Sequence, residues 1–235
     1  MTNKQLMLTT AALLVGTVAS SQTYALDWYI SGSASHSNPS SKVFNDGANG
    51  AGNPQVEINS DTKIGFAIGL EISPALKVEL EYSRAKYGTD TSRSLGTDGR
   101  ALDQFSTDAD LDVDLLTLNA SYEFANTSKF TPYLKGGIGS TSYDMKGDLY
   151  VGSNGGDTFG GFLPATFTYE GDGSEFAYFV GAGVSMEVSK QLALTLEYRY
   201  ADLGEIATEY DDNGDRLQTD MKTNNIQAGV TYSFK

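Results

Sequence analysis

The chain has 235 residues, no cysteine and a formal net charge of −14, with 30 acidic against 16 basic residues. This length suits one domain, and the absence of cysteine excludes disulfides, thiolate zinc sites and a lipid anchor on cysteine. The acidic balance argues against nucleic acid as a partner, because no basic surface is available to neutralise phosphates.

The first 25 residues predict a secretory signal peptide. Lys4 supplies the positive start, an apolar run covers residues 6–19, and residues 23–25 read Thr-Tyr-Ala before the expected cleavage point. The run is too short for a membrane helix of about 20 apolar residues. We therefore expect a signal peptide at 1–25 and a single domain at 26–235.

Eight later stretches alternate apolar residues with polar or small ones, which is the period-two pattern of a β-strand. The stretch from Ile64 to Ile72 is the cleanest, because large apolar residues alternate there with glycine, alanine and glutamate. In chain order, the strands are expected at residues 27–35, 64–72, 76–83, 116–124, 132–139, 176–188, 192–201 and 224–234.

Short and long connections alternate along the chain. Tight turns follow the second, fourth and sixth strands, and long polar loops are expected at residues 36–60, 87–110, 142–175 and 202–221. Bacterial outer-membrane barrels have this arrangement, with tight periplasmic turns, long outer loops and an even number of strands.

The fourth strand breaks the alternation at its start. Leu111, Val113 and Leu115 have the opposite parity to Leu116 and Leu118. One extra residue in the strand would restore the pattern, so we expect a β-bulge near Leu115.

Period two alone does not say which face of the barrel points inward, and a soluble barrel around an apolar ligand is the competing architecture. Size decides between them, because the lumen of eight strands is just wide enough for side chains to fill. The apolar face carries too many large residues to fit there. The other face is rich in glycine, with Gly65, Gly69, Gly137, Gly139, Gly181, Gly183 and Gly229. The pattern therefore predicts an eight-stranded antiparallel up-and-down transmembrane β-barrel.

Five charged residues fall on the inward face. They are Glu79, Glu81, Lys135, Glu197 and Arg199. Since the third and seventh strands face each other across the lumen, we expect Arg199 to meet Glu79 or Glu81, joined by the other charges, because buried charges need partners. Two interpretations stay open: a structural plug, or a gate that rearranges to pass water or ions.

Three segments carry a family resemblance: Leu194 to Gly204, Thr131 to Gly139, and Val230 to Phe234. They resemble the opacity-protein and outer-membrane protein β-barrel superfamily, which is related to the membrane domain of outer-membrane protein A. The resemblance covers the whole expected mature chain. It implies the outer membrane of a Gram-negative bacterium, with outer-membrane lipid and lipopolysaccharide as surroundings.

The last strand is similar to the signal that the outer-membrane assembly machinery reads. Val230, Tyr232 and Phe234 supply its alternating outward residues, and Lys235 after Phe234 departs from the usual aromatic ending. We expect these three residues to act as the C-terminal assembly signal.

Candidate chemistry is sparse. His36 is the sole histidine, which is weak support for a catalytic triad. Asp108, Asp110, Asp112 and Asp114 alternate at the outer end of the fourth strand, where solvated carboxylates are expected and calcium is the alternative. We expect no catalytic residue, no cofactor and no metal site.

Two functions stay open at this point. The first is a structural or surface-interaction role, like that of the family's adhesins and antigens, with four long extracellular loops displayed to an unidentified ligand. The alternative is a small porin-like channel for ions or small solutes. Enzymatic activity is not expected.

Overall fold

The computed structural model describes residues 27–40, 58–95, 103–153, 165–209 and 218–234. The expected signal peptide, 1–25, and parts of all four expected loops lie outside this range. The described residues form eight strands, namely β1 (Asp27–Pro39), β2 (Asp61–Ser73), β3 (Leu76–Leu95), β4 (Asp103–Glu123), β5 (Phe130–Ser153), β6 (Ala165–Glu187), β7 (Leu192–Ala207) and β8 (Gln218–Ser233).

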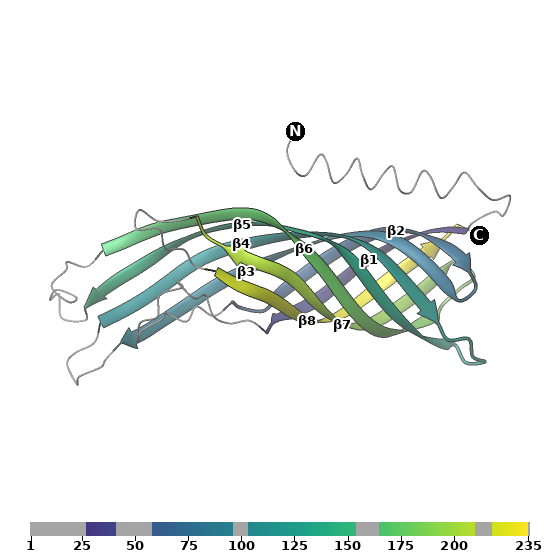
Figure 1. Cartoon of the computed structure of the whole chain (residues 1–235). Helices are drawn as coiled ribbons and strands as arrows, with labels where there is room; N and C mark the ends of the chain where they lie inside the picture. The colour runs from purple at the N-terminus through teal and green to yellow at the C-terminus, as the bar shows by residue number, and fades with distance from the viewer. Residues whose placement is uncertain (1–26, 41–57, 96–102, 154–164, 210–217, 235) are drawn as a thin grey trace.

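The strands close into one barrel in sequence order, and every neighbouring pair is antiparallel (Figure 1). β8 completes the barrel by pairing with β1 from Tyr29↔Ser233 to Pro39↔Thr223. This confirms the predicted eight-stranded up-and-down barrel. No helix among the described residues has the length and apolar character of a membrane span.

Four strands are much longer than predicted. β3 continues to Leu95, β4 begins at Asp103, β5 continues to Ser153 and β6 begins at Ala165. The segments predicted as loops at 87–110 and 142–175 are therefore mostly strand, and β7 and β8 likewise take up much of 202–221. In Figure 1 the barrel lies on its side, and the strands β3 to β6 project to the left beyond the ends of the others. We call this left-hand end the upper end of the barrel.

The bulge predicted near Leu115 is absent from β4. Pairing of β4 with β3 and with β5 runs without a register shift. Leu111, Val113 and Leu115 are buried on the same inward face as Thr117 and Asn119. The parity is constant, and it is the polarity of the two faces that reverses along the strand.

The lower part of the barrel is apolar on the outside, as predicted. Phe66 has an exposed fraction of 65 %, and the outward positions that accompany it are Ile30, Ile64, Ile68, Leu118, Leu134, Ile138, Val180, Leu196, Ile226 and Val230. A strand of nine or ten residues, tilted by about 40°, spans the roughly 25 Å of an outer-membrane belt.

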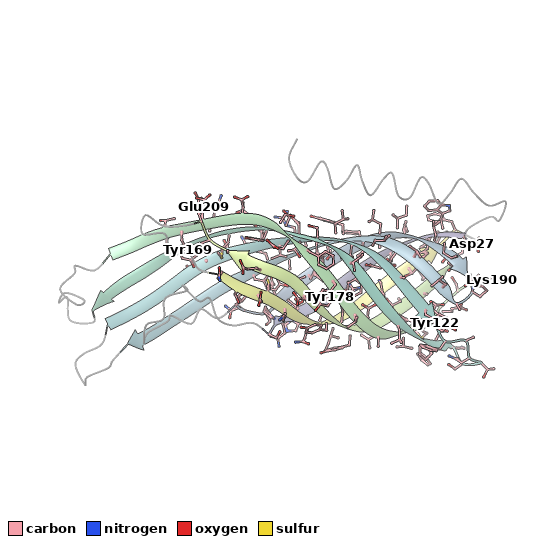
Figure 2. All side chains as sticks on the ribbon, viewed as in Figure 1. Asp27, Tyr122, Tyr169, Tyr178, Lys190 and Glu209 are labelled. Carbon is pink, nitrogen blue, oxygen red and sulfur yellow. The ribbon has the colours of Figure 1, made fainter. Side chains whose placement is uncertain are left out.

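Three tyrosines mark the upper edge of this belt. The hydroxyl groups of Tyr82 and Tyr198 donate to Asp114 (2.6 Å) and Asn224 (2.7 Å) on the next strand. Tyr178, labelled in Figure 2, likewise donates to Asp202 (3.4 Å). An apolar ring below and a polar contact above suit a tyrosine at the interface between lipid and water.

Above the belt the barrel is built like a soluble protein, with its apolar side chains inside. We call this group the upper core: Ile58, Ala85, Tyr87, Leu111, Val113, Leu115, Tyr143, Met145, Ala177, Phe179, Ala201, Leu203, Ile206 and Met221. Tyr169, expected in an exposed loop, packs against it. Outside the membrane the hydrophobic effect drives apolar residues inward, which explains the reversal of polarity.

Candidate functional site

The five charged residues predicted for the lumen all lie on inward positions in the lower part of the barrel. We call them the charge network: Glu79 and Glu81 from β3, Lys135 from β5, and Glu197 and Arg199 from β7. Since inward residues recur at every second position of a strand, this face follows directly from the sequence. The structure brings all five side chains together.

Arg199 crosses the lumen from β7 to β3. Its Nη1 lies 2.8 Å from Oε1 of Glu81, its Nη2 lies 3.1 Å from Oε2 of the same residue, and its Nε lies 2.7 Å from Oε1 of Glu197. The guanidinium has an exposed fraction of 0 % and lies over the ring of Phe179, with 3.9 Å between Cζ and the ring centroid. The paired contact with Glu81 is the planar geometry that arginine and carboxylate favour.

Lys135 connects the two glutamates of β3. Its Nζ forms an ion pair with Glu79 and lies 3.4 Å from Oε2 of Glu81. Glu81 therefore contacts both Lys135 and Arg199, and it is the centre of the charge network.

Four further residues complete the network, and they were not singled out in the sequence. Tyr29 donates to Oε2 of Glu79 (2.9 Å), and Tyr133 donates to Oε2 of Glu197 (3.0 Å). The Nδ2 of Asn119 lies 3.1 Å from Glu79 and 2.9 Å from Glu81. Lys63, buried on the inward face of β2, adds a third cation to the lumen. Their inward parity was visible in the sequence, but their partners depend on the pairing of strands.

A cavity of about 290 Å³ lies below the charge network. Glu79, Glu81 and Glu197 line one end of it, and Pro74 and Lys190 of the short turns line the other. The lumen is therefore hollow toward the short turns and filled at the level of the network.

The four predicted aspartates behave differently from the lumen charges, because they face outward on β4. Asp110 lies 3.1 Å from Lys86, and Asp112 lies 3.4 Å from Arg84. The contact with Asp110 raises the pKa of Lys86. In the described part of the chain, no three acidic or histidine side chains gather closely enough to hold a metal ion.

Comparison with known proteins shows which family has this architecture. Residues 8–234 match the family described as the outer membrane protein beta-barrel domain. The chain belongs to this family. It is accordingly an outer-membrane β-barrel of a Gram-negative bacterium. In bacterial barrels the short turns face the periplasm and the longer connections face the outside, and the ends of this barrel are named by that rule.

The family's relatives are distant in sequence. The outer membrane protein PagN of Salmonella typhimurium is 23 % identical over 127 residues, which cover 50 % of this chain and 48 % of PagN, so the match spans about half of that relative. OprG of Pseudomonas aeruginosa has a TM-score of 0.55 at 16 % identity, over 89 % of this chain and 96 % of OprG. The outer membrane protein AlkL, solved in lipid bilayers, has a TM-score of 0.53 at 16 % identity, over 92 % of this chain and 93 % of AlkL. These likenesses support the fold.

The residues of the expected assembly signal face outward at the periplasmic end of β8. Val230, Tyr232 and Phe234 are all exposed toward the lipid side. The rings of Tyr232 and Phe234 meet edge to face, with 5.2 Å between their centroids. We propose that this stripe is the signal that the assembly machinery binds.

Lumen glycines make room for aromatic rings on the neighbouring strand. Tyr133 is paired with Gly183, and a Cβ added to Gly183 would lie 2.6 Å from both Cζ and the hydroxyl oxygen of Tyr133. The same relation joins Tyr29 to Gly69. The glycine thus lets the ring lie against the barrel wall, where its hydroxyl reaches the charge network.

We predict that Gly183→Ala lowers the free energy of unfolding by about 1 to 3 kcal/mol, because the added methyl would lie 2.6 Å from both the ring of Tyr133 and the carbonyl oxygen of Leu196. Gly32→Ala is the matched control, since a Cβ at Gly32 meets nothing within 4 Å. Urea unfolding in lipid vesicles compares the two. Equal stability of both variants would show that the ring does not depend on the glycine.

Proposed function

We propose that this chain is a non-conducting outer-membrane barrel with a surface-interaction role, of the adhesin or antigen kind, and that it is not an enzyme. The observation that carries the proposal is that the lumen is closed twice in series. The charge network fills the lumen within the membrane, and the upper core fills it above.

The two closures differ in kind. In the charge network, Arg199 is bonded from β7 to β3 across the full width of the lumen. In the upper core, Leu111, Met145, Ile206 and Met221 come from four different strands, and each has an exposed fraction of 1 % or less. Ions would have to cross both a paired charge cluster and an apolar barrier, and each opposes their passage.

The part of the barrel above the membrane supports the surface role. β3 to β6 continue upward as a paired sheet as far as Leu95, Asp103, Ser153 and Ala165. Recognition usually lies on loops held by a rigid scaffold. We propose an extracellular ligand for this region, and outer-membrane lipid and lipopolysaccharide as the partners of the belt below it. We propose that the protein does not bind nucleic acid.

A small channel for ions or small solutes is the second candidate function. The cavity of about 290 Å³ favours it, since the lumen below the charge network is hollow toward the short turns.

Conductance in a planar lipid bilayer separates the two functions. We expect wild type, Arg199→Ala and Tyr87→Ala each to be silent, because one closure persists in each, and the double variant to conduct. Mobility on an unboiled gel confirms that each variant is folded. Steady conductance of the wild type would support the channel, and conductance of Arg199→Ala alone would show that the upper core is no barrier.

The surface role is tested by shortening one hairpin in register. Residues 89–95 pair with residues 103–109, so removing both sets joins the same connection to the pair Gly88↔Asp110. We expect a folded barrel, and a several-fold loss in attachment of expressing cells to immobilised matrix proteins. Unchanged attachment would contradict the proposed role of this hairpin.

A further inference from the structure

Several polar side-chain atoms in the middle of the lumen are buried without a hydrogen-bond partner among the described residues. The atoms concerned are Oγ of Ser35 and Ser83, Oγ1 of Thr117 and Thr141, Oδ1 of Asn119 and Asn225, and Oε1 of Gln227. Each of these residues is at least nine-tenths buried. Buried polar groups in native proteins are nearly always hydrogen-bonded, to protein or to water. We therefore expect a bound molecule to supply hydrogen bonds to these seven atoms.

Strand pairing places most of these atoms in one arc around the charge network. Gln227 on β8 is paired with Glu197 on one side and with Ser35 on the other. Ser35 is paired in turn with Lys63.

The arc continues on the next two strands. Ser83 follows Glu81 by two positions on β3, so both point inward, and Thr117 on β4 is paired with Glu81. Five neighbouring strands, from β8 through β1, β2 and β3 to β4, thus present polar groups to the same part of the lumen.

The charges around the arc decide what class of ligand it takes. Lys63, Lys135 and Arg199 balance Glu79, Glu81 and Glu197. A bound cation or anion would leave one buried charge without a partner, which is costly. The amide oxygens can only accept hydrogen bonds, whereas the hydroxyl groups can donate and accept. A small neutral molecule that both donates and accepts fits these groups, and water has these properties.

The ends of the arc fix the direction from which water arrives. Gln227 also lines the cavity below the network, and that cavity reaches the short turns on the periplasmic side. Above the arc, Thr141 is paired with Leu115 of the upper core. The route is therefore polar from the periplasm up to the arc, and the upper core fills the lumen beyond it.

We infer that the arc is a buried hydration site, filled with ordered water that exchanges with the periplasm and not with the outside. Water there completes the hydrogen bonds of the arc and brings Lys63 and Arg199 into contact with periplasmic solvent. The charge network is then a hydrated plug with a blind upper end, whatever the barrel binds at the cell surface.

Magnetisation transfer from water, measured by solid-state NMR on labelled protein in lipid bilayers, tests this inference. We expect transfer to Ser35, Ser83 and Thr117 at rates similar to those of Ser31, which lines the cavity. Leu111 and Met145 of the upper core are expected to show none. Transfer to the core equal to that of the arc would mean that water passes through, and no transfer to Ser83 and Thr117 would mean a dry arc; either result overturns the inference.

Gln227→Leu tests the route, because it places an apolar side chain where the cavity meets the arc. We expect loss of transfer to Ser35 in this variant, with transfer to Ser31 unchanged. Thr195→Val is the matched control, since Thr195 lines the cavity lower down and valine keeps its shape. Undiminished transfer to Ser35 in Gln227→Leu, or equal loss in Thr195→Val, would refute entry past Gln227.

Discussion

Arg199→Ala will lower the free energy of unfolding by about 3 to 5 kcal/mol, a large loss for one substitution, because it leaves two buried glutamates without their main partner. Glu81 loses both of its contacts with the guanidinium, and Glu197 loses the contact with Nε. Phe179 also loses the cation that lies over its ring. Urea unfolding in lipid vesicles, followed by mobility of the unboiled protein on a gel, measures the loss.

Lys86→Ala is the control for this prediction. Lys86 also forms an ion pair, with Asp110, but its side chain has an exposed fraction of 57 %, and exposed ion pairs contribute little to stability. The double variant Arg199→Ala with Glu81→Gln is expected to recover part of the stability, because it removes one of the uncompensated charges. A loss for Arg199→Ala no larger than that for Lys86→Ala would contradict a buried network.

Leu111→Ala will lower the free energy of unfolding by about 2 to 5 kcal/mol, the usual result of emptying part of a packed core. Leu111 has an exposed fraction of 0 % and lies in the upper core, just after the segment predicted as a loop at 87–110 and at the predicted irregular start of the fourth strand. The same unfolding measurement applies. If residue 111 belonged to a mobile loop, the change would be within about 0.5 kcal/mol.

Asp112→Ala is the neighbouring control, since Asp112 faces outward and pairs with Arg84 at 3.4 Å. We expect a much smaller change than for Leu111→Ala, because ion pairs at the surface contribute little to stability. Equal effects of Leu111→Ala and Asp112→Ala would mean that the inward and outward faces of β4 are not distinct above the membrane.

Tyr87 gives the upper core its polar attachment. Its hydroxyl lies 2.6 Å from Oγ of Ser37. Burial raises the pKa of Tyr87 to about 12, against the smaller and opposite effect of this hydrogen bond. The phenol therefore stays neutral at physiological pH, as a side chain in an apolar core must.

The sequence was sufficient for the number of strands, the lipid-facing residues and the five charges of the network. Each of these depends only on parity within one strand, and parity is visible without any knowledge of the neighbours. Arg199 and Glu81 could be matched across the lumen because eight strands place the third opposite the seventh.

The strand ends were wrong for a physical reason. The residues up to Asp110 were predicted as a loop because their outward face is polar, although the strand runs on from Asp103. The predicted bulge came from the same assumption, that the apolar face is always the outer one. Above the membrane water replaces lipid as the surroundings, so the preferred face changes while the parity does not.

Four further residues of the charge network were not predicted, because their contacts depend on the register between strands. Tyr29, Asn119, Tyr133 and Lys63 are inward by parity, but their partners are set by how one strand is paired with the next. Tyr133 meets Glu197 because β6 lies between their strands and presents Gly183 to the ring. One strand's sequence does not contain that information.

β4 keeps one parity throughout while its surroundings change from lipid to water. The chain has no cysteine, so single cysteines with spin labels can be placed at every position from 110 to 122 without background. Accessibility to oxygen and to a water-soluble nickel reagent is then measured in lipid bilayers. We predict oxygen access at 116 and 118, nickel access at 110 and 112, and access to neither reagent at 111, 113 and 115. Exposure of 111 and 113 with protection of 110 and 112 would contradict the claim and restore the bulge.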